Sequence, residues 1–539
     1  MQLNRKGIDS PEWKAKGYLM PNFDIEAIRK NTHEHPKWVH FGGGNIFRAF
    51  QANLVQDLLN QGAIDTGVIV TDFSDLIFNV YKPHDNIQIL VTLKANGSVD
   101  KTIIGSIMEA LCINKGNENN DFARLREIFR NKSLQMISFS ITEKGYSLRL
   151  SGEQSDFQPD VLYDFEHGPE SPRTYFGKVV SLLYERYLAG QLPLALVSMD
   201  NCSHNGDKVF AAVKAFSEEW EKRGLVNKGF CKYITDPTKL SYPWTMIDKI
   251  TPRPHSDVEK ILTNDGIADL TNLVTGAKVF SAPFVNSEEI QYLVIEDKFP
   301  NGRPPLEKAG VYFTDRETVD KVEKMKVCTC LNPLHTCLAI FGCLLGFNLI
   351  SKEMEDHDLH RLIEIIGYTE GLPVVVDPKI ISPRKFIDEV VNIRFPNPFM
   401  PDTPQRIACD TSQKIPIRFG ETIKAYLKHS DLKLSNLNAI PLVFAGWLRY
   451  LVGIGDDGKE MELSPDPLLN EVQKDLKGLK LDSAFDVHKV CQPLLSRDDI
   501  FGVDLYKVGL AEKAESYFEK MMKEKGAVRK TIQEVINSQ

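Results

Sequence analysis

The sequence of 539 residues lacks the features that mark membrane and secreted proteins. No stretch reaches the roughly 18 uninterrupted apolar residues that a membrane-spanning helix needs. The first residues, MQLNRKGIDSPEWKAKGYLM, contain no apolar core of signal-peptide length. The longest apolar run, Cys337–Ile350, is too short to span a bilayer. We therefore expect a buried helix there and no membrane partner.

The chain has neither a disulfide framework nor an excess of basic charge. Nine irregularly spaced cysteines form no disulfide framework, which favours a reducing, cytoplasmic location. A formal net charge of -8 at pH 7 is a poor match for non-specific nucleic-acid binding. Apolar residues make up 42% of the chain, enough for a sizeable globular core. These numbers argue against a nucleic-acid partner and leave room for a local basic pocket that binds an acidic metabolite. We expect a small-molecule ligand and a monomer or small homo-oligomer, although no interface can be read from the sequence.

Short apolar runs alternate with helical patterns between Trp38 and about Val285. The runs Val68–Phe73, Gln135–Thr142 and Leu194–Asn201 show no polar alternation, as expected for parallel strands covered on both faces. Strands that alternate with helices indicate βαβ units. The pattern predicts an α/β fold, with a Rossmann-type doubly wound sheet in its N-terminal part.

The second half of the chain has a different pattern, because helical spacing dominates from about Lys324 onward. The residues before Pro36 are polar and read as an extension that lies over the first domain. We therefore expect an N-terminal extension over residues 1–36, a doubly wound domain over 37–290, and a mostly α-helical domain over 291–539.

Three consecutive glycines follow the first predicted strand, in WVHFGGGNIFRAF. A turn at Gly42–Gly44, followed by a helix that starts near Ile46, places free backbone N–H groups at a helix N-terminus, where they favour a pyrophosphate. Glycine also lets the backbone approach the phosphates closely. Phe47 replaces the usual third glycine, so the stretch alone is also compatible with a purely structural strand-to-helix corner.

Asp72, just past the next predicted strand, supports the dinucleotide interpretation. A carboxylate there would accept hydrogen bonds from ribose hydroxyls and repel a 2′-phosphate, which favours NAD over NADP. The alternative is that Asp72 caps a helix. We predict that the cofactor contacts Gly42, Gly43, Gly44, Asn45, Ile46, Phe47, Arg48 and Asp72.

Seven segments, in order along the chain, resemble the mannitol dehydrogenase family of polyol-specific long-chain dehydrogenases. They are GGGNIFRAFQ, TEKGY, SMDNCSHNG, YPWTMIDKITP, IEDKFPNGRPP, KMKVCTCLNPLH and RIACDTSQKIP. The resemblance implies zinc-independent hydride transfer with NAD. It further implies that residues 37–290 form the NAD-binding domain and 291–539 the substrate domain.

Hydride transfer at a secondary alcohol needs a group that handles the hydroxyl proton. Burial lowers the pKa of an amine toward working pH, so a buried lysine is suited to this role. The family's catalytic lysine stands three residues after a glutamate and shortly before an Asn-x-x-His pair. The resemblance therefore implies that Lys326 is the acid/base, preceded by Glu323. Lys324 and Lys321 are the alternative candidates for this role. The non-catalytic alternative is that the run is only a solvated, lysine-rich helix face.

The spacing around Lys326 departs from the family. Five residues separate Lys326 from Asn332 here, where the family pattern has four. In a continuous α-helix one extra residue turns a side chain by about 100°. A bulge, or a helix that begins after the lysine, would restore the arrangement.

Asn332 and His335 are three residues apart and share one face of a helix. On residue type alone they read as a capping asparagine and a buried core histidine. The resemblance implies that Asn332 donates to the alkoxide oxygen and that His335 binds a substrate hydroxyl. It also makes Asn201, which follows a predicted strand, the second donor to that oxygen. Ligands of doubly wound sheets bind at such carboxyl ends of strands.

Three further residues are expected at the substrate. Asp248 would hold a substrate hydroxyl, or only pair with Lys249 or Arg253. The resemblance places Arg406 and Lys414 on the sugar chain, and a guanidinium binds a carboxylate through two parallel hydrogen bonds. Without the family, ion pairs with Asp402 or Asp410 would be the expectation.

No metal is expected. Cys328, Cys330, Cys337 and Cys343 fit no standard zinc spacing and are predicted to be buried thiols. The sequence thus predicts an NAD-dependent dehydrogenase that acts on the CH–OH group of a polyol or sugar acid. The long N-terminal extension and the CTCLNPLH variant favour the longer, uronate-type members of the family. A non-catalytic dinucleotide- or sugar-binding protein is the alternative of a different class.

Overall fold

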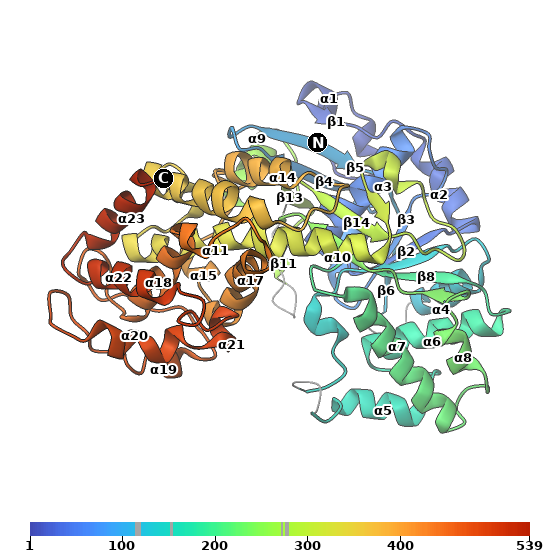
Figure 1. Cartoon of the computed structure of the whole chain (residues 1–539). Coiled ribbons are helices and arrows are strands. Elements are labelled where there is room, and N and C mark those ends of the chain that lie inside the picture. The colour runs from blue at the N-terminus through green and yellow to red at the C-terminus, as the bar shows by residue number, and fades with distance from the viewer. Residues whose placement is uncertain (114–119, 151–154, 271–272, 275–279) are drawn as a thin grey trace. The chain divides into compact units, whose positions relative to one another are not determined.

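The computed structural model describes residues 1–113, 120–150, 155–270, 273–274 and 280–539. The chain forms two units (Figure 1). Unit 1 comprises Met1–Lys94 and Ser98–Asp320, and unit 2 comprises Ala95–Gly97 and Lys321–Gln539. Whereas we expected a boundary after residue 290, the division falls after Asp320.

A six-stranded sheet is the centre of unit 1. Its strands are β2 (Trp38–Phe41), β3 (Val68–Asp72), β6 (Ile107–Cys112), β7 (Met136–Phe139), β8 (Leu194–Ser198) and β9 (Leu240–Ser241). Their order is β6-β3-β2-β7-β8-β9, and every neighbouring pair is parallel. This is the strand order of a Rossmann-type doubly wound sheet, as the sequence pattern predicted.

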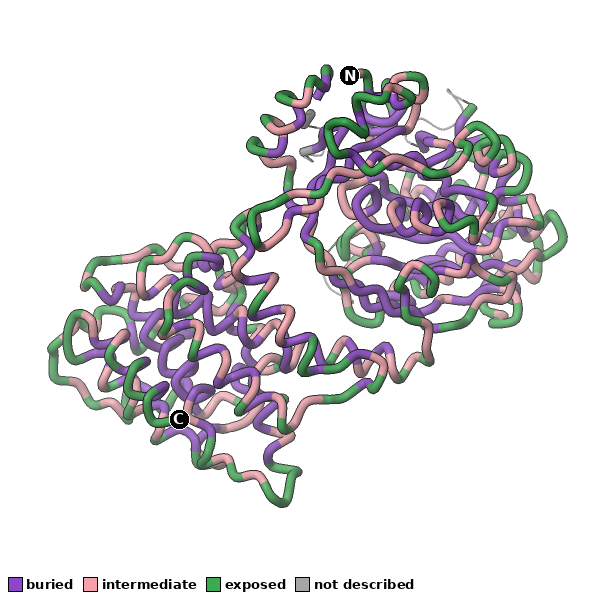
Figure 2. Tube along the Cα trace, turned by 90° about the horizontal axis from the view of Figure 1, so that it is seen from above, coloured by how far each residue is buried: buried purple, intermediate pink, exposed green. Residues whose placement is uncertain are grey.

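Both faces of this sheet are buried, which explains why its strands carry apolar residues on both sides. Val39 and Phe41 of β2 belong to one core cluster, and Trp38 belongs to the other with Val68 and Val70 of β3. Figure 2 shows this buried interior in purple. The helices of unit 1 are α1 (Glu12–Ala15), α2 (Ile25–Glu34), α3 (Ala52–Asn60), α4 (Asp121–Arg130), α5 (Pro159–His167), α6 (Tyr175–Leu188), α7 (Asn205–Lys222), α8 (Phe230–Thr235) and α9 (Ser256–Asn264).

Smaller sheets explain where unit 1 ends. They contain β1 (Tyr18–Leu19), β5 (Val99–Ile104), β4 (Gln88–Leu93) and β13 (Phe284–Glu288); β10 (Thr245–Asp248), β14 (Tyr292–Glu296) and β15 (Tyr312–Thr314); and β11 (Leu273–Val274) with β12 (Phe280–Ser281). Because β14 pairs with β10 and with β15, the chain stays in unit 1 well past residue 290. Likewise β1, in the N-terminal extension, pairs with β5, and Trp13 is fully buried. The extension is therefore an integral part of unit 1.

Unit 2 is built from helices. The connecting helix α10 (Arg316–Met325) crosses the boundary, and the others are α11 (Asn332–Leu345), α12 (Ile350–Glu353), α13 (His357–Glu364), α14 (Pro383–Glu389), α15 (Pro404–Ile407), α16 (Thr411–Ile415), α17 (Glu421–Lys428), α18 (Ala439–Leu451), α19 (Leu469–Val472), α20 (Val487–Leu495), α21 (Asp498–Phe501), α22 (Ala511–Met521) and α23 (Ala527–Asn537). Every residue of α18 is buried. The buried carboxylate of Glu370 accepts the backbone N–H groups of Asn438, Ala439 and Ile440, so the start of this core helix is capped.

The apolar run predicted to be a buried helix lies largely in α11. The helical stretch Arg316–Leu345 is long and apolar enough to cross a membrane by composition, but 72% of its most apolar window is buried within the protein. Leu338, Ile340 and Phe341 are completely buried. The prediction of a core helix is therefore confirmed for this segment.

Glu353, at the end of α12, is a completely buried carboxyl group. Neither of its oxygens has a hydrogen-bond partner among the described residues. It packs against Gly342 of α11, where a Cβ atom would lie 2.1 Å from its Oε1. Burial, with a smaller contribution from Asp356, raises the pKa of Glu353 to about 9. The side chain is therefore protonated in the folded protein at neutral pH.

We predict that Glu353→Gln stabilises the protein increasingly as the pH rises. In the unfolded chain a glutamate ionises near pH 4.3, whereas the folded protein keeps this proton up to about pH 9. The wild-type free energy of unfolding therefore falls across this window, and the variant lacks this loss. Between about pH 5 and pH 8 the advantage of the variant should grow by at least about 1.4 kcal/mol. Urea unfolding at both pH values measures it, with the exposed Glu355→Gln as control; a constant difference would contradict the prediction.

Candidate active site

The glycine turn of unit 1 lies at the carboxyl end of β2. Gly42 has φ 113°, and a Cβ atom there would lie 2.3 Å from the backbone oxygen of Ser140, so only glycine fits. A Cβ atom on Gly44 would meet nothing within 4 Å, so this position faces open space. The helical chain begins at Asn45, and the first N–H groups of a helix have no partner within it. The turn therefore fits a pyrophosphate.

Two of the predicted cofactor residues support the turn from inside the protein. Phe47 and Arg48 are completely buried, in a π-helical segment (Phe47–Gln51) that leads into α3. The ring of Phe47 stacks on His40 with 4.5 Å between centroids. The Arg48 guanidinium donates to Asn45 Oδ1, Gln88 Oε1, Ser281 Oγ and the carbonyl of Ala282. Their side chains thus hold the turn in place, while Asn45 and Ile46 are half-buried.

Asp72, the last residue of β3, binds the glycine turn directly. Its Oδ2 accepts the backbone N–H of Gly43 at 2.6 Å. Its Oδ1 accepts the N–H and the hydroxyl of Ser74 at 2.7 and 2.6 Å. The carboxylate therefore links the ends of β2 and β3 at the edge where a dinucleotide would lie.

A second hydrogen-bonded cluster stands at the ends of β7 and β8. Asp200 accepts from the backbone N–H groups of Ile141 and Thr142 and from the hydroxyl of Tyr146. This joins the TEKGY segment to the SMDN segment. Asn201, the next residue, is exposed. Strand order reverses between β2 and β7, and ligands of doubly wound sheets bind at such a reversal, at the carboxyl ends of the strands.

Asp248 belongs to one of the smaller sheets of unit 1. It is the last residue of β10, stands opposite Tyr292 of β14 and is buried. Thr245, at the start of β10, is held by the buried Asn205, which donates to its hydroxyl at 2.8 Å and accepts its N–H at 3.0 Å. The SHNG segment thus fixes the strand that carries Asp248.

In unit 2, the extra residue after Lys326 is absorbed by a wider helical turn. Lys326–Cys330 is a π-helix, in which the N–H of Leu331 donates to the carbonyl of Lys326 at 3.1 Å. Leu331 leaves helical geometry, and α11 begins anew at Asn332. The bulge that the spacing called for is therefore present. Lys326 is 2% exposed, whereas Lys324 is exposed and Lys321 is half-buried, so Lys326 is the buried amine of the three.

Asn332 and His335 lie in the first turn of α11, so both belong to one helix, as the three-residue spacing assumed. Burial lowers the pKa of His335 to about 4; the neighbouring Arg418, Arg406 and Arg394 lower it too, whereas Asp402 raises it. His335 is therefore a neutral imidazole at neutral pH. Among the described residues, neither its Nε2, which lies 3.7 Å from Asp402 Oδ2, nor the Asn332 carboxamide has a hydrogen-bond partner. Both groups can therefore serve a ligand.

The predicted basic residues Arg406 and Lys414 are both engaged within unit 2. Arg406 is largely exposed and forms an ion pair with Asp402, the arrangement expected without the family. Lys414 donates to the carbonyls of Ile407 and Cys409 at 3.1 and 2.5 Å, and burial lowers its pKa.

Two other arginines near His335 were missed by the sequence analysis. Arg394 is buried, and Arg418 is half-buried. One sequence signal was available: Arg418 stands four residues after Lys414 in a helical pattern, so the two share a face. Nothing in the chain before folding indicates that either arginine lies beside His335.

The thiol-rich segment carries no metal centre in the described part of the chain, where no group of three or more His, Cys, Asp or Glu residues could hold an ion. Cys330 and Cys337 are buried, as predicted, and Cys328 and Cys343 are half-buried. Burial raises the pKa of the Cys337 thiol well above its usual range.

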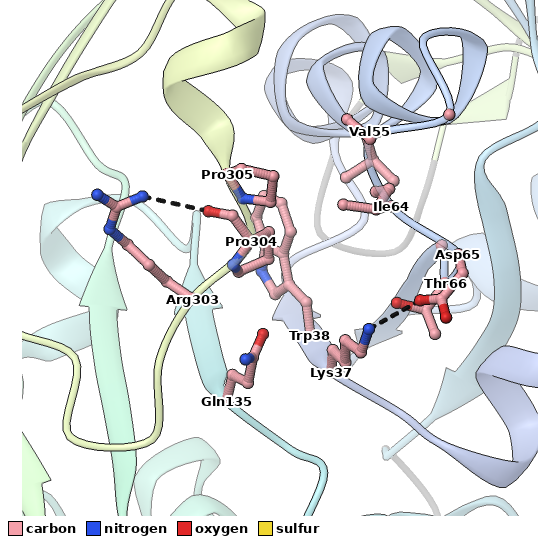
Figure 3. Close-up of a pocket in the computed structure, with 13 residues that line it drawn as sticks. Lys37, Trp38, Val55, Ile64, Asp65, Thr66, Gln135, Arg303, Pro304 and Pro305 are labelled. Carbon is pink, nitrogen blue, oxygen red and sulfur yellow. Dashed lines mark hydrogen bonds and ion pairs between the residues drawn. The ribbon is translucent and has the colours of Figure 1, made fainter.

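A cavity of about 420 Å³ lies elsewhere in unit 1 (Figure 3). Its lining includes Lys37, Trp38, Gln135 and Arg303, and Lys37 pairs with Asp65 across 2.8 Å. Trp38 begins β2, and Gln135 directly precedes β7. The cavity is therefore at the amino ends of the strands, opposite the edge where ligands of such sheets bind.

Comparison with known proteins identifies the class. Residues 36–308 match the mannitol dehydrogenase Rossmann domain and 318–522 the mannitol dehydrogenase C-terminal domain. D-mannonate oxidoreductase of Thermotoga maritima is 53% identical, over 99% of both chains. The crystal structure of a D-sorbitol dehydrogenase in substrate-free form is similar with a TM-score of 0.81 and 25% identity, and covers 99% of this chain and 100% of that chain. Mannitol 2-dehydrogenase of Pseudomonas fluorescens, in complex with NAD and D-mannitol, has the same fold with a TM-score of 0.68 and 24% identity, and covers 100% of both chains.

The chain belongs to the mannitol dehydrogenase family. It is an NAD-dependent dehydrogenase that acts on CH–OH groups. The family, the fold class and the cofactor predicted from the sequence are thereby confirmed.

We predict that Asp72→Ala weakens NADH binding by about tenfold, because the glycine turn loses its charge-assisted hydrogen bond to β3. Discrimination against NADPH should fall as well, since the carboxylate that repels a 2′-phosphate is gone. Fluorescence titration with both cofactors measures the two effects. Asp65→Asn, in the cavity at the amino ends of the strands, is the matched control; Figure 3 shows Asp65 in the lining of this cavity. An unchanged affinity for NADH in Asp72→Ala would refute a role of Asp72 in holding the turn.

Proposed function

We propose that this protein catalyses the NADH-dependent reduction of D-fructuronate to D-mannonate, and the reverse reaction with NAD. The observation that carries the proposal is the 53% identity to a D-mannonate oxidoreductase over 99% of both chains. We further propose that the enzyme acts in the cytoplasm, where its nine cysteines would stay reduced.

The charges around His335 support a sugar acid rather than a neutral polyol as substrate. Arg394, Arg406 and Arg418 all influence this histidine, against the single carboxylate of Asp402. Lys414 adds a fourth cation, because Arg418 and Arg406 in turn lower its pKa, and Asp410, which raises it, adds a second carboxylate. Surplus positive charge in a partly buried region favours an anionic ligand.

The glycine turn supports NAD as the cofactor. Gly44 faces open space, and the N–H groups that follow it stand at a helix N-terminus. The Asp72 carboxylate at the end of β3 favours NAD over NADP. When bound, the dinucleotide supplies the hydride that reduces the carbonyl carbon.

In the proposed reaction, Lys326 gives a proton to the ketone oxygen as the carbonyl carbon is reduced, and removes it in the reverse direction. Asn332 and Asn201 donate hydrogen bonds to this oxygen and stabilise the negative charge that develops on it. His335, neutral at working pH, binds a neighbouring hydroxyl. Asp248, Arg406 and Lys414 would hold the rest of the sugar chain.

A substrate panel tests the proposal. With NADH and wild-type enzyme, we expect the highest kcat/KM for D-fructuronate, ahead of D-tagaturonate and D-fructose. Preference for tagaturonate would indicate a tagaturonate reductase, and turnover of fructose alone a mannitol 2-dehydrogenase; either result would overturn the proposal. NADH binding without turnover of any sugar would indicate a non-catalytic binding protein. The absorbance of NADH at its nicotinamide band follows all three reactions.

Lys326→Met should lower kcat by at least about 100-fold and leave the Kd of NADH unchanged, because it removes the proton donor alone. Lys324→Met is the matched control: this lysine is exposed and precedes the wide turn, and its activity should stay near that of wild type. Steady-state kinetics and an NADH titration give both quantities. A large loss in the control, with activity retained in Lys326→Met, would move the acid/base role to Lys324.

A further inference from the structure

Arg418 is a partly buried guanidinium whose charge has no carboxylate partner among the described residues. Its Nη1 donates to the hydroxyl of Thr336 at 2.5 Å, and no ion pair accompanies this bond. Burial alone lowers its pKa to about 10, with no contribution from a nearby acid. A charge that is partly shielded from water and lacks a counter-ion is less stable than a paired one, so an anion that reaches it is bound favourably.

The remaining donors of Arg418 are open to a ligand. Its Nε and Nη2 have no hydrogen-bond partner in the described part of the protein. Neither atom is fully buried, so both are accessible to solvent. Nη1 is anchored to Thr336, which in turn donates to the carbonyl of Asn332. The guanidinium is thus held beside the first turn of α11 and presents two adjacent N–H groups outward. This is the geometry that binds a carboxylate through two parallel hydrogen bonds.

The other cations near His335 are less suited to this role. Arg406 is already paired with Asp402, and its side chain is 61% exposed. Lys414 spends its ammonium donors on the carbonyls of Ile407 and Cys409. A substrate carboxylate that used Arg406 would have to compete with Asp402, whereas Arg418 needs no exchange of partners.

We propose that Arg418 binds the carboxylate of the sugar-acid substrate and thereby selects acids over neutral polyols. This inference rests on the proposed function. In a hexulosonate, a short chain of hydroxyl-bearing carbons separates the keto group from the carboxylate. The extended chain spans about one helical turn, about 5.4 Å. Asn332, proposed at the keto oxygen, and Thr336, which anchors Arg418, are one such turn apart on α11.

The test compares binding of D-mannonate and D-mannitol to the enzyme–NADH complex, on which neither ligand reacts. Calorimetry on wild type should show tighter binding of the acid. In Arg418→Gln the affinity for D-mannonate should fall by about 30-fold to 100-fold while that for D-mannitol changes little, since only the charge-assisted pair is lost. Arg418→Lys should recover part of the loss. In kinetics, the effect should appear in the KM of the acid more than in kcat.

Thr336→Val is a second test variant, which changes the protein less than Arg418→Gln does. It removes the hydroxyl that anchors Nη1 and should weaken D-mannonate binding by a smaller factor than Arg418→Gln, again without affecting D-mannitol. Arg361→Gln, an exposed arginine of α13 paired with Glu364, is the matched control and should change neither affinity. Equal losses for both ligands in Arg418→Gln would reveal a structural role, and no loss would place the carboxylate elsewhere; both results overturn the proposal.

Failure of the proposed function gives a different result. If wild type reduces no sugar acid but still binds D-mannonate in preference to D-mannitol, and Arg418→Gln abolishes that preference, the assignment of Arg418 stands while the proposed reaction falls. If wild type shows no preference for the acid, the assignment of Arg418 falls whatever the substrate panel shows.

Discussion

Parallel pairing of β2 with both β3 and β7 is the constraint on which the cofactor half of this protein depends. Because the strands run in one direction, the loops that follow them leave the sheet at the same edge. The glycine turn after β2 packs against the loop after β7 so closely that Gly42 has no room for a side chain beside Ser140. Asp72 then ties the end of β3 to the same turn. The open space at Gly44 is a product of these contacts.

The wide turn between Lys326 and Asn332 plays the same organising role in unit 2. In a regular α-helix, the extra residue would rotate Lys326 and all residues before it by about 100° relative to Asn332. The π-helix confines that rotation to one turn, and α11 begins independently at Asn332. π-helical turns of this kind are frequent at functional sites. Lys326 thus stays buried despite the altered spacing.

Unit 2 compensates its buried charges in three different ways. The carboxylate of Glu370 is met by three backbone N–H groups at the start of α18. Glu353 has no partner and stays protonated instead, as its raised pKa requires. An arginine cannot give up its proton at neutral pH, so the second solution is closed to Arg418. Within the described part of the chain, Arg418 has only the Thr336 hydroxyl as a partner, and the rest of its guanidinium is accessible to solvent. In our proposal the substrate carboxylate neutralises this charge.

The sequence by itself determined the strands of the parallel sheet, the helical second half and the glycine turn, because apolar periodicity and glycine are local signals. Lys326, Asn332 and His335 were singled out through the family resemblance, and their roles stay predictions. The sequence pattern set the domain boundary after residue 290, whereas the division into units falls after Asp320, because the short strands β14 and β15 carry little periodicity and are recognisable only through pairing. It proposed two roles for Asp72 and missed Arg418 beside His335. Those outcomes were decided only by the tertiary structure, because a side chain's partners depend on which distant segments pack against it. The residues next to it in the sequence do not determine which distant segments these are.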